Sequence, residues 1–123
     1  MIELYTWNTP NGEKARIMLE ECGLEHRVHP VDLDRGKQFD PEFLAISPNN
    51  KIPAIVDPDG PDGEPISIFE SGAILLYLAD KCGRLMPTEA RLRWQVVEWL
   101  MFQTGGIGPT LGQLGHFRYA SPE

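Results

Sequence analysis

The chain has 123 residues, of which 41% are hydrophobic, and a formal net charge of -7 at pH 7. This length supports one ordinary hydrophobic core, so one domain is expected. The acidic balance and the scattered basic residues argue against nucleic acid or an anionic membrane surface as a partner, because either would require clustered lysine and arginine.

The first third of the chain predicts a β-α-β unit. Residues 2–6 alternate in the manner of a strand, and turn residues at 9–12 precede a helical run over 13–22 that Gly23 ends. Residues 28–33 predict a second strand, which a right-handed crossover would make parallel to the first.

The middle of the chain predicts a short helix, a hairpin and a buried helix. Residues 40–44 have a proline in the first turn of the short helix. Residues 53–57 and 66–69 predict two strands, and the Pro/Gly/Asp turn between them indicates a hairpin. Residues 71–81 predict a nearly all-apolar helix closed by Gly83, so this helix is expected to be central.

These elements predict an α/β fold for residues 1–83, a β-α-β-α-β-β-α sandwich around a mixed four-stranded sheet. Residues 84–123 predict a linker and a helix that has Thr88 as its N-cap and ends near 104, where a glycine cluster is expected to stop it or form a hinge. One side of this helix is apolar, with Leu92, Val96, Val97, Leu100 and Met101. The sandwich offers this side few partners. We therefore interpret the segment as the first helix of an otherwise missing all-α domain and expect the chain to be a fragment.

The N-terminus and the cysteines bear on the cellular compartment. The chain begins without a basic region or a long apolar run, and no later stretch is long enough to span a bilayer, so we expect a cytoplasmic protein. Cys22 and Cys82 are far apart and form no Cys-x-x-Cys pair, so two buried or idle thiols are expected. His26 and His29 have no acidic or cysteine partner at ligand spacing, and no metal site is expected.

A first candidate binding site lies where the central helix begins. The free N–H groups and positive dipole end of that helix can bind a carboxylate, assisted by the Ser71 hydroxyl. Glu70 beside it can pair with an ammonium group, so an amino-acid head matches the two residues. The alternative is that Ser71 only caps its helix and Glu70 is solvated.

A second candidate site is the bend at Lys51, Ile52 and Pro53. Proline has no N–H for a strand ladder, and such bends can hold a cis peptide that leaves the preceding backbone groups exposed. An extended peptide can then pair with Ile52, while Lys51 and Gln38 hold a terminal carboxylate. The alternative is that Lys51 is a surface lysine and Gln38 a loop residue.

The third candidate is the loop that leads into the first helix, whose N-terminus would lower the pKa of a thiol placed there. The loop has no thiol of its own, but Thr9 and Asn11 can donate hydrogen bonds to a ligand thiolate, which makes them the candidate catalytic residues. Both can also be ordinary turn and cap residues, and Tyr5 is a rival sulfur donor for which packing is favoured. Together the three sites indicate a small zwitterionic thiol peptide, glutathione.

Two stretches, residues 50–55 (Asn-Lys-Ile-Pro-Ala-Ile) and 70–78 (Glu-Ser-Gly-Ala-Ile-Leu-Leu-Tyr-Leu), resemble the glutathione transferase superfamily. The likeness covers nearly the whole chain. Within the superfamily, residues 9–12, 46–51 and 105–109 resemble the nu class, bacterial proteins related to the yeast prion nitrogen regulator.

The resemblance implies a thioredoxin-like N-terminal domain with a cis Pro53, a glutathione site, a helical C-terminal domain and a homodimer. It also implies one role for each candidate residue: the γ-glutamyl head for Glu70 and Ser71, the cysteinyl backbone for Ile52, the glycyl end for Lys51 and Gln38, and the sulfur for Thr9 with Asn11.

Nu-class proteins are glutathione-dependent disulfide reductases, and this resemblance implies the same activity here. Where thioredoxin has its Cys-x-x-Cys, this chain has a thiol-free loop, so exchange is expected to use bound glutathione thiols. Two alternatives remain open: glutathione transfer to small electrophiles, and a non-catalytic binding module.

Overall fold

The computed structural model describes residues 1–119. The last four residues of the predicted second segment, 120–123, lie outside the described residues. The chain divides into two compact units, Met1–Leu85 and Met86–Glu123. The elements of the first unit are β1 (Ile2–Thr6), α1 (Pro10–Cys22), β2 (His26–Pro30), α2 (Pro41–Leu44), β3 (Ala54–Asp57), β4 (Ile66–Phe69) and α3 (Ser71–Cys82). Those of the second are α4 (Ala90–Phe102) and α5 (Gly108–Tyr119).

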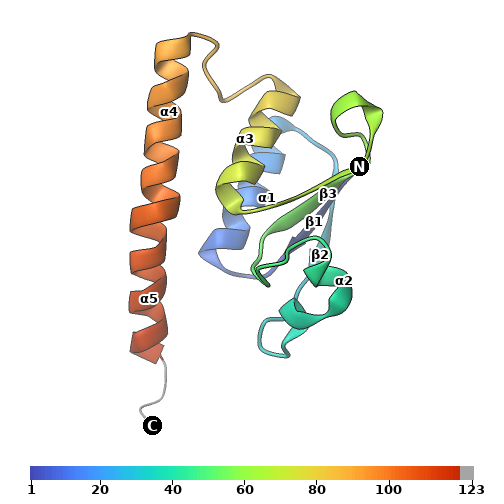
Figure 1. Cartoon of the computed structure of the whole chain (residues 1–123), viewed down its shortest axis with the longest axis vertical. Coiled ribbons are helices and arrows are strands. Elements are labelled where there is room, and N and C mark those ends of the chain that lie inside the picture. Colours follow the sequence, from blue (N-terminus) through green and yellow to red (C-terminus); the bar gives the residue numbers. More distant parts are fainter. Residues whose placement is uncertain (120–123) are drawn as a thin grey trace. The chain divides into compact units, whose positions relative to one another are not determined.

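The first unit contains one four-stranded mixed sheet with the order β2-β1-β3-β4 (Figure 1). β1 pairs in parallel with β2, with Leu4 opposite Val28, and the α1 crossover makes this possible. β1 and β3 are antiparallel, as are the hairpin strands β3 and β4. This is the predicted thioredoxin-like sandwich.

Side chains of successive strand residues point to opposite faces of the sheet, and a hydrophobic core lies on each face. On one face, Leu4 and Ile55 pack with residues of α1 and α3, including Leu19 and Leu78, all fully buried. The residue before Ile55 in β3, Ala54, belongs to the core on the opposite face and packs with residues around α2. Figure 1 shows α1 and α3 side by side, with α2 apart from them. Successive strand residues point to opposite faces of the sheet, so each face carries apolar side chains, and helices cover both of these apolar faces.

Two element boundaries in this unit differ from the prediction. β2 spans His26–Pro30 rather than 28–33, because the chain leaves the sheet after Pro30 and Val31 turns into the second core. α1 begins at Pro10 rather than at residue 13, with Thr9 as its N-cap. Proline suits the first helical position because its missing N–H would have no partner there.

The second unit is one helical run with a wide turn in it. Glu89, not Thr88, caps α4, because its carboxylate accepts the N–H groups of Arg91 and Leu92 at 2.9 and 3.0 Å. The predicted end near 104 is wrong: a π-helical turn, Gln103–Ile107, continues into α5. At Gly108 a Cβ would lie 2.9 Å from the Gln103 carbonyl oxygen, so glycine permits this turn. In the described part of the chain no helix has the length and apolarity to cross a membrane.

Candidate functional site

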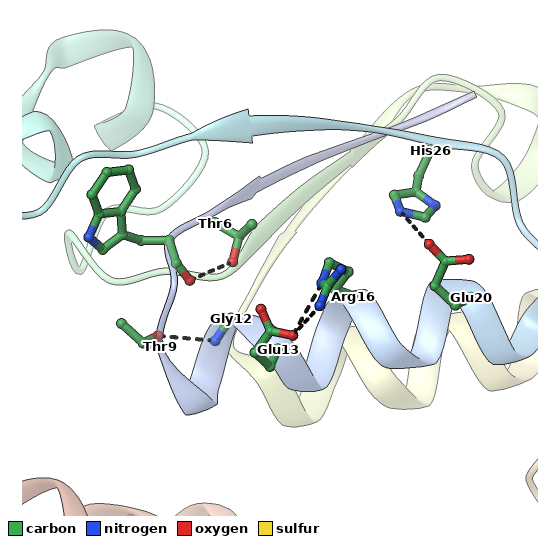
Figure 2. A network of polar contacts seen from close by, with 8 residues as sticks. Thr6, Thr9, Gly12, Glu13, Arg16, Glu20 and His26 are labelled. Carbon is green, nitrogen blue, oxygen red and sulfur yellow. Dashed lines mark hydrogen bonds and ion pairs between the residues drawn. The ribbon is translucent and has the colours of Figure 1, made fainter.

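Local hydrogen bonds order the short connection between the end of β1 and the N-terminus of α1 (Figure 2). The Thr9 hydroxyl accepts the Gly12 N–H at 3.2 Å, and the Thr6 hydroxyl donates to the Trp7 carbonyl at 3.4 Å. A Cβ on Gly12 would lie only 2.2 Å from the Thr6 hydroxyl oxygen, so the close approach of helix and strand requires glycine. Thr9 does cap the helix, but its hydroxyl proton is still available to a ligand.

A pocket of about 300 Å³ opens in front of this helix end. Five of the eight predicted site residues line it, together with three that the sequence reasoning did not name. The predicted residues are Thr9, Asn11, Gln38, Lys51 and Ile52, and the additional ones are Leu33, Phe39 and Asn50. Segments far apart in the sequence therefore meet at one site, and none of its lining residues is a cysteine.

Gln38 provides an independent sign that the pocket receives a polar ligand. Its side-chain oxygen is fully buried and has no hydrogen-bond partner in the described structure. Burying an unpaired amide oxygen costs about 1–3 kcal/mol, so a ligand N–H at this point would be strongly favoured. Rotation of the amide would instead present its NH₂ donors to a carboxylate.

The wall formed by Lys51 and Ile52 is held by a residue that lies behind it. Ser47 is fully buried, and its hydroxyl donates to the Lys51 carbonyl at 2.7 Å. The Asn50 N–H in turn donates to the Ser47 carbonyl at 2.9 Å, while Asn50 adopts a left-handed conformation with φ of 51°. The Ile52–Pro53 peptide bond is cis, as the resemblance implied.

Glu70 and Ser71 lie outside the residues that line this pocket, at the start of α3. Glu70 has φ of 73° and ψ of 116°, a conformation that non-glycine residues rarely adopt, and its carboxylate does not cap the helix. Residues held in such conformations concentrate at functional sites. The carboxylate is close enough to Lys14 of α1 to act on its ammonium: burial lowers the pKa of Lys14, and Glu70 opposes that change. An acidic group and the N–H groups of a helix thus adjoin here, as an amino-acid head requires.

Tyr5, the rival sulfur donor, is used in packing. Its ring stacks on His29 with centroids 4.7 Å apart, and it lines a different pocket from Thr9 and Asn11. The His29 imidazole also contacts Glu3, and this hydrogen bond holds the pKa of the Glu3 carboxyl below its usual value. The contacts of His29 with Tyr5 and Glu3 therefore link neighbouring strands of the sheet. Among the described residues, no group of three or more side chains could hold a metal ion.

Sequence reasoning missed the relation between the two cysteines. Cys22 and Cys82 were expected to be buried or idle thiols. Cys22 is buried, but the two Sγ atoms also lie 2.7 Å apart at the C-terminal ends of α1 and α3. A shared pattern could have revealed the pair: Cys22 is the last residue of one predicted helix, Cys82 directly follows the other, and each precedes the glycine expected to end its helix.

The chain matches the family model of the glutathione S-transferase N-terminal domain over residues 9–81. It is 57% identical to the disulfide-bond oxidoreductase YfcG of Escherichia coli strain K12, over 100% of this chain and 58% of that protein.

Two solved structures are similar to the whole described fold. A glutathione transferase family member from Pseudomonas fluorescens, with two glutathione bound, has a TM-score of 0.95 at 55% identity, covering 98% of this chain and 53% of that one. A glutathione transferase from Pseudomonas putida, with one glutathione disulfide bound per subunit, has a TM-score of 0.94 at 53% identity, covering 98% and 52%. This chain spans little more than half the length of these relatives. By its sequence and its fold, it belongs to the glutathione S-transferase family through that family's N-terminal domain.

Proposed function

We propose that the protein is a glutathione-dependent disulfide-bond oxidoreductase in which bound glutathione, and not the protein, supplies the reacting thiols. The observation that carries this proposal is the pocket of about 300 Å³ that has Thr9 and Asn11 at the positive end of α1 and no cysteine in its lining. A helix N-terminus stabilises a thiolate, and the thiolate is the reactive form in disulfide exchange.

The printed names and ligands of the relatives support this choice. YfcG is a disulfide-bond oxidoreductase, and so is YghU of Escherichia coli strain K12, which is 39% identical to this chain. The Pseudomonas structures contain two glutathione molecules in one case and glutathione disulfide in the other. These are the reduced and oxidised forms that a disulfide reductase interconverts.

In the proposed complex each end of the tripeptide meets groups of matching charge. Glu70 and the N-terminus of α3 bind the γ-glutamyl ammonium and carboxylate, and the exposed backbone of Ile52 pairs with the cysteinyl residue. Lys51 and the buried amide of Gln38 bind the glycyl end. This arrangement leads the cysteinyl sulfur toward Thr9 and Asn11.

The chemistry consists of two exchanges. A glutathione thiolate attacks one sulfur of the substrate disulfide, and the other substrate sulfur leaves as a thiolate and takes up a proton. A second glutathione thiolate then attacks the mixed disulfide, releasing the second substrate thiol and forming glutathione disulfide. Thr9 and Asn11 donate hydrogen bonds to the sulfur that bears negative charge, which lowers the pKa of the bound thiol.

The test compares variants in the reduction of a small-molecule disulfide by excess glutathione. Asn11→Ala should lower kcat roughly tenfold or more while changing the glutathione Kd much less, because its partner bears charge mainly during exchange. The double variant Cys22→Ala/Cys82→Ala should keep its activity. Loss of activity in the double variant would mean that the protein supplies a thiol and that the proposal is wrong.

Transfer of glutathione to small electrophiles is the second candidate, and the same thiolate site favours it. Rates on an aryl halide and on a disulfide, measured side by side, separate the two activities. Binding of glutathione without turnover on either substrate would identify a binding module. Nu-class membership and a homodimer complete the proposal, and sedimentation of the protein tests the dimer.

A further inference from the structure

The two cysteines of the chain meet at one end of the first unit although they are 60 positions apart in the sequence. Cys22 is the last residue of α1 and Cys82 is the last residue of α3. Each is followed by a glycine in the left-handed conformation, with φ of 66° at Gly23 and 64° at Gly83. The two helices therefore end in the same way at the same place.

The distance between the sulfur atoms is close to that of a bond. The Sγ atoms are 2.7 Å apart, so closing a disulfide of about 2.0 Å requires them to approach by only about 0.7 Å. Small side-chain rotations supply such a movement. α1 packs against α3, so the two helix ends that carry the cysteines are held side by side.

We propose that Cys22 and Cys82 form a reversible intramolecular disulfide, a redox site separate from the glutathione pocket, for which a small-molecule disulfide such as glutathione disulfide is the oxidant.

The two thiols differ in access, which sets the order of events. Cys22 is 8% exposed, and burial, followed by its hydrogen bond with Cys82, raises the pKa of its thiol to about 12. Cys82 is only partly buried, beside the carbonyl groups of Ala79 and Arg84. Cys82 is therefore the thiol that meets the oxidant, and Cys22 is the resolving thiol.

The reaction balances in two exchanges. The Cys82 thiolate attacks one sulfur of glutathione disulfide, and one glutathione leaves and takes up a proton. Cys22 then gives up its proton and attacks the Cys82 sulfur of the mixed disulfide, which expels the second glutathione. Two protein thiols are oxidised to one disulfide, and one glutathione disulfide is reduced to two glutathione molecules.

The bond would join the two helices at the ends opposite the candidate site. Cys22 lies about 16 Å along the axis of α1 from Asn11, given a rise of about 1.5 Å per residue. The disulfide would thus leave the pocket open. It would restrict the unfolded chain and raise the Tm by roughly 5–15 °C, because it closes a long loop.

The reduced protein is incubated in buffers with an increasing ratio of glutathione disulfide to glutathione. The remaining thiols are then blocked by alkylation, and the intact mass is measured. The wild type should lose two hydrogen atoms and resist alkylation. Trypsin should then release residues 17–27 joined to residues 82–84, and a reductant should separate them. Recovery of both cysteines as alkylated thiols in the most oxidising buffer would overturn the proposal, as would a disulfide only between two chains.

Three variants make the test specific. Cys22→Ala should stop at a mixed disulfide, with one glutathionyl group on Cys82, and should show no rise in Tm. Cys82→Ala should stay unmodified, and a glutathionyl group on Cys22 would overturn the proposed order. Glu70→Ala keeps both thiols and should close the disulfide like the wild type, so failure of the glutathione site and failure of this proposal are distinguishable.

Discussion

Removing the Tyr77 hydroxyl should destabilise the protein by an amount that depends on pH. The Asp57 carboxylate at the end of β3 is 1% exposed, and it accepts hydrogen bonds from the Tyr77 hydroxyl at 2.5 Å and the Asp59 N–H at 3.0 Å. It also pairs with the Lys81 ammonium at 2.9 Å. Tyr77 and Lys81 both belong to α3, so this carboxylate fastens α3 to the sheet.

The expected loss in the free energy of unfolding follows from the kind of hydrogen bond that is removed. Tyr77→Phe keeps the packing of the ring and removes one hydrogen bond to a buried charge, which costs about 1.5–3 kcal/mol. Tyr5→Phe is the matched control, because the described structure gives the Tyr5 hydroxyl no hydrogen bond, and it should cost much less. Urea unfolding at pH 7 measures both differences.

The pH dependence has a definite sign. Burial would raise the pKa of Asp57, but the hydrogen bonds from Tyr77, Lys81 and Asp59 outweigh it and hold the pKa below the ordinary value of 3.8. A carboxylate with a depressed pKa contributes stability above the ordinary value and loses it as the pH falls through the folded-state pKa. The cost of Tyr77→Phe should therefore be full at pH 7 and shrink below about pH 4. An equal cost at every pH would refute this reasoning and attribute the loss to packing.

Three further predictions concern the site and the second unit. Glu70→Ala should weaken glutathione binding by roughly 1.5–3 kcal/mol in calorimetry, and unchanged affinity in a folded variant would remove Glu70 from the site. Ser47→Ala leaves the Lys51 carbonyl without its 2.7 Å partner, so it should lower the free energy of unfolding by about 1–3 kcal/mol and raise the glutathione Kd; equal stability would show that water replaces the hydroxyl. The helices of the second unit expose large apolar side chains, including Trp94 at 68% and Trp99 at 70%, so the 123-residue chain should self-associate. Light scattering tests this, and a monomer of 13.8 kDa at all concentrations would contradict it.

The sequence predicted best those elements whose apolar pattern is set by burial on the sheet. β1, β3 and α3 lie within one residue of their predicted bounds, because each has a face or a whole body in a core. β4 has only exposed and half-buried residues, and the turn before it and the helix after it set its ends. β2 was displaced because its residues are mostly exposed or half-buried, so hydrophobic periodicity does not mark its ends. The long terminal helix was cut short because glycine usually ends helices, whereas Gly108 here admits a wide turn.

The local geometry of the candidate site was predictable where a single residue type has a distinctive role. The cis bond at Pro53 and the helix start at Ser71 could be recognised from neighbouring residues alone, whereas their roles in binding stay predictions. Leu33 and Phe39 could not, because only the folded loop brings their side chains to the pocket. Ser47 was missed for a similar reason: it acts through the Lys51 carbonyl, and a buried serine in a loop leaves no mark in the sequence.

One geometric relation accounts for both kinds of sulfur chemistry proposed here. Contact between Cys22 and Cys82 shows that the C-termini of α1 and α3 meet, and the influence of Glu70 on Lys14 shows that the N-terminal part of α1 lies near the start of α3. The helices are therefore parallel, so that their positive ends together favour an anionic ligand while their far ends bring two thiols into contact. Since about 16 Å of helix separates Cys22 from Asn11, neither protein thiol can reach a sulfur bound at the pocket. In the proposed reaction the thiols that act at the pocket therefore come from the ligand, and the protein's own cysteines form the separate redox site proposed at the far helix ends.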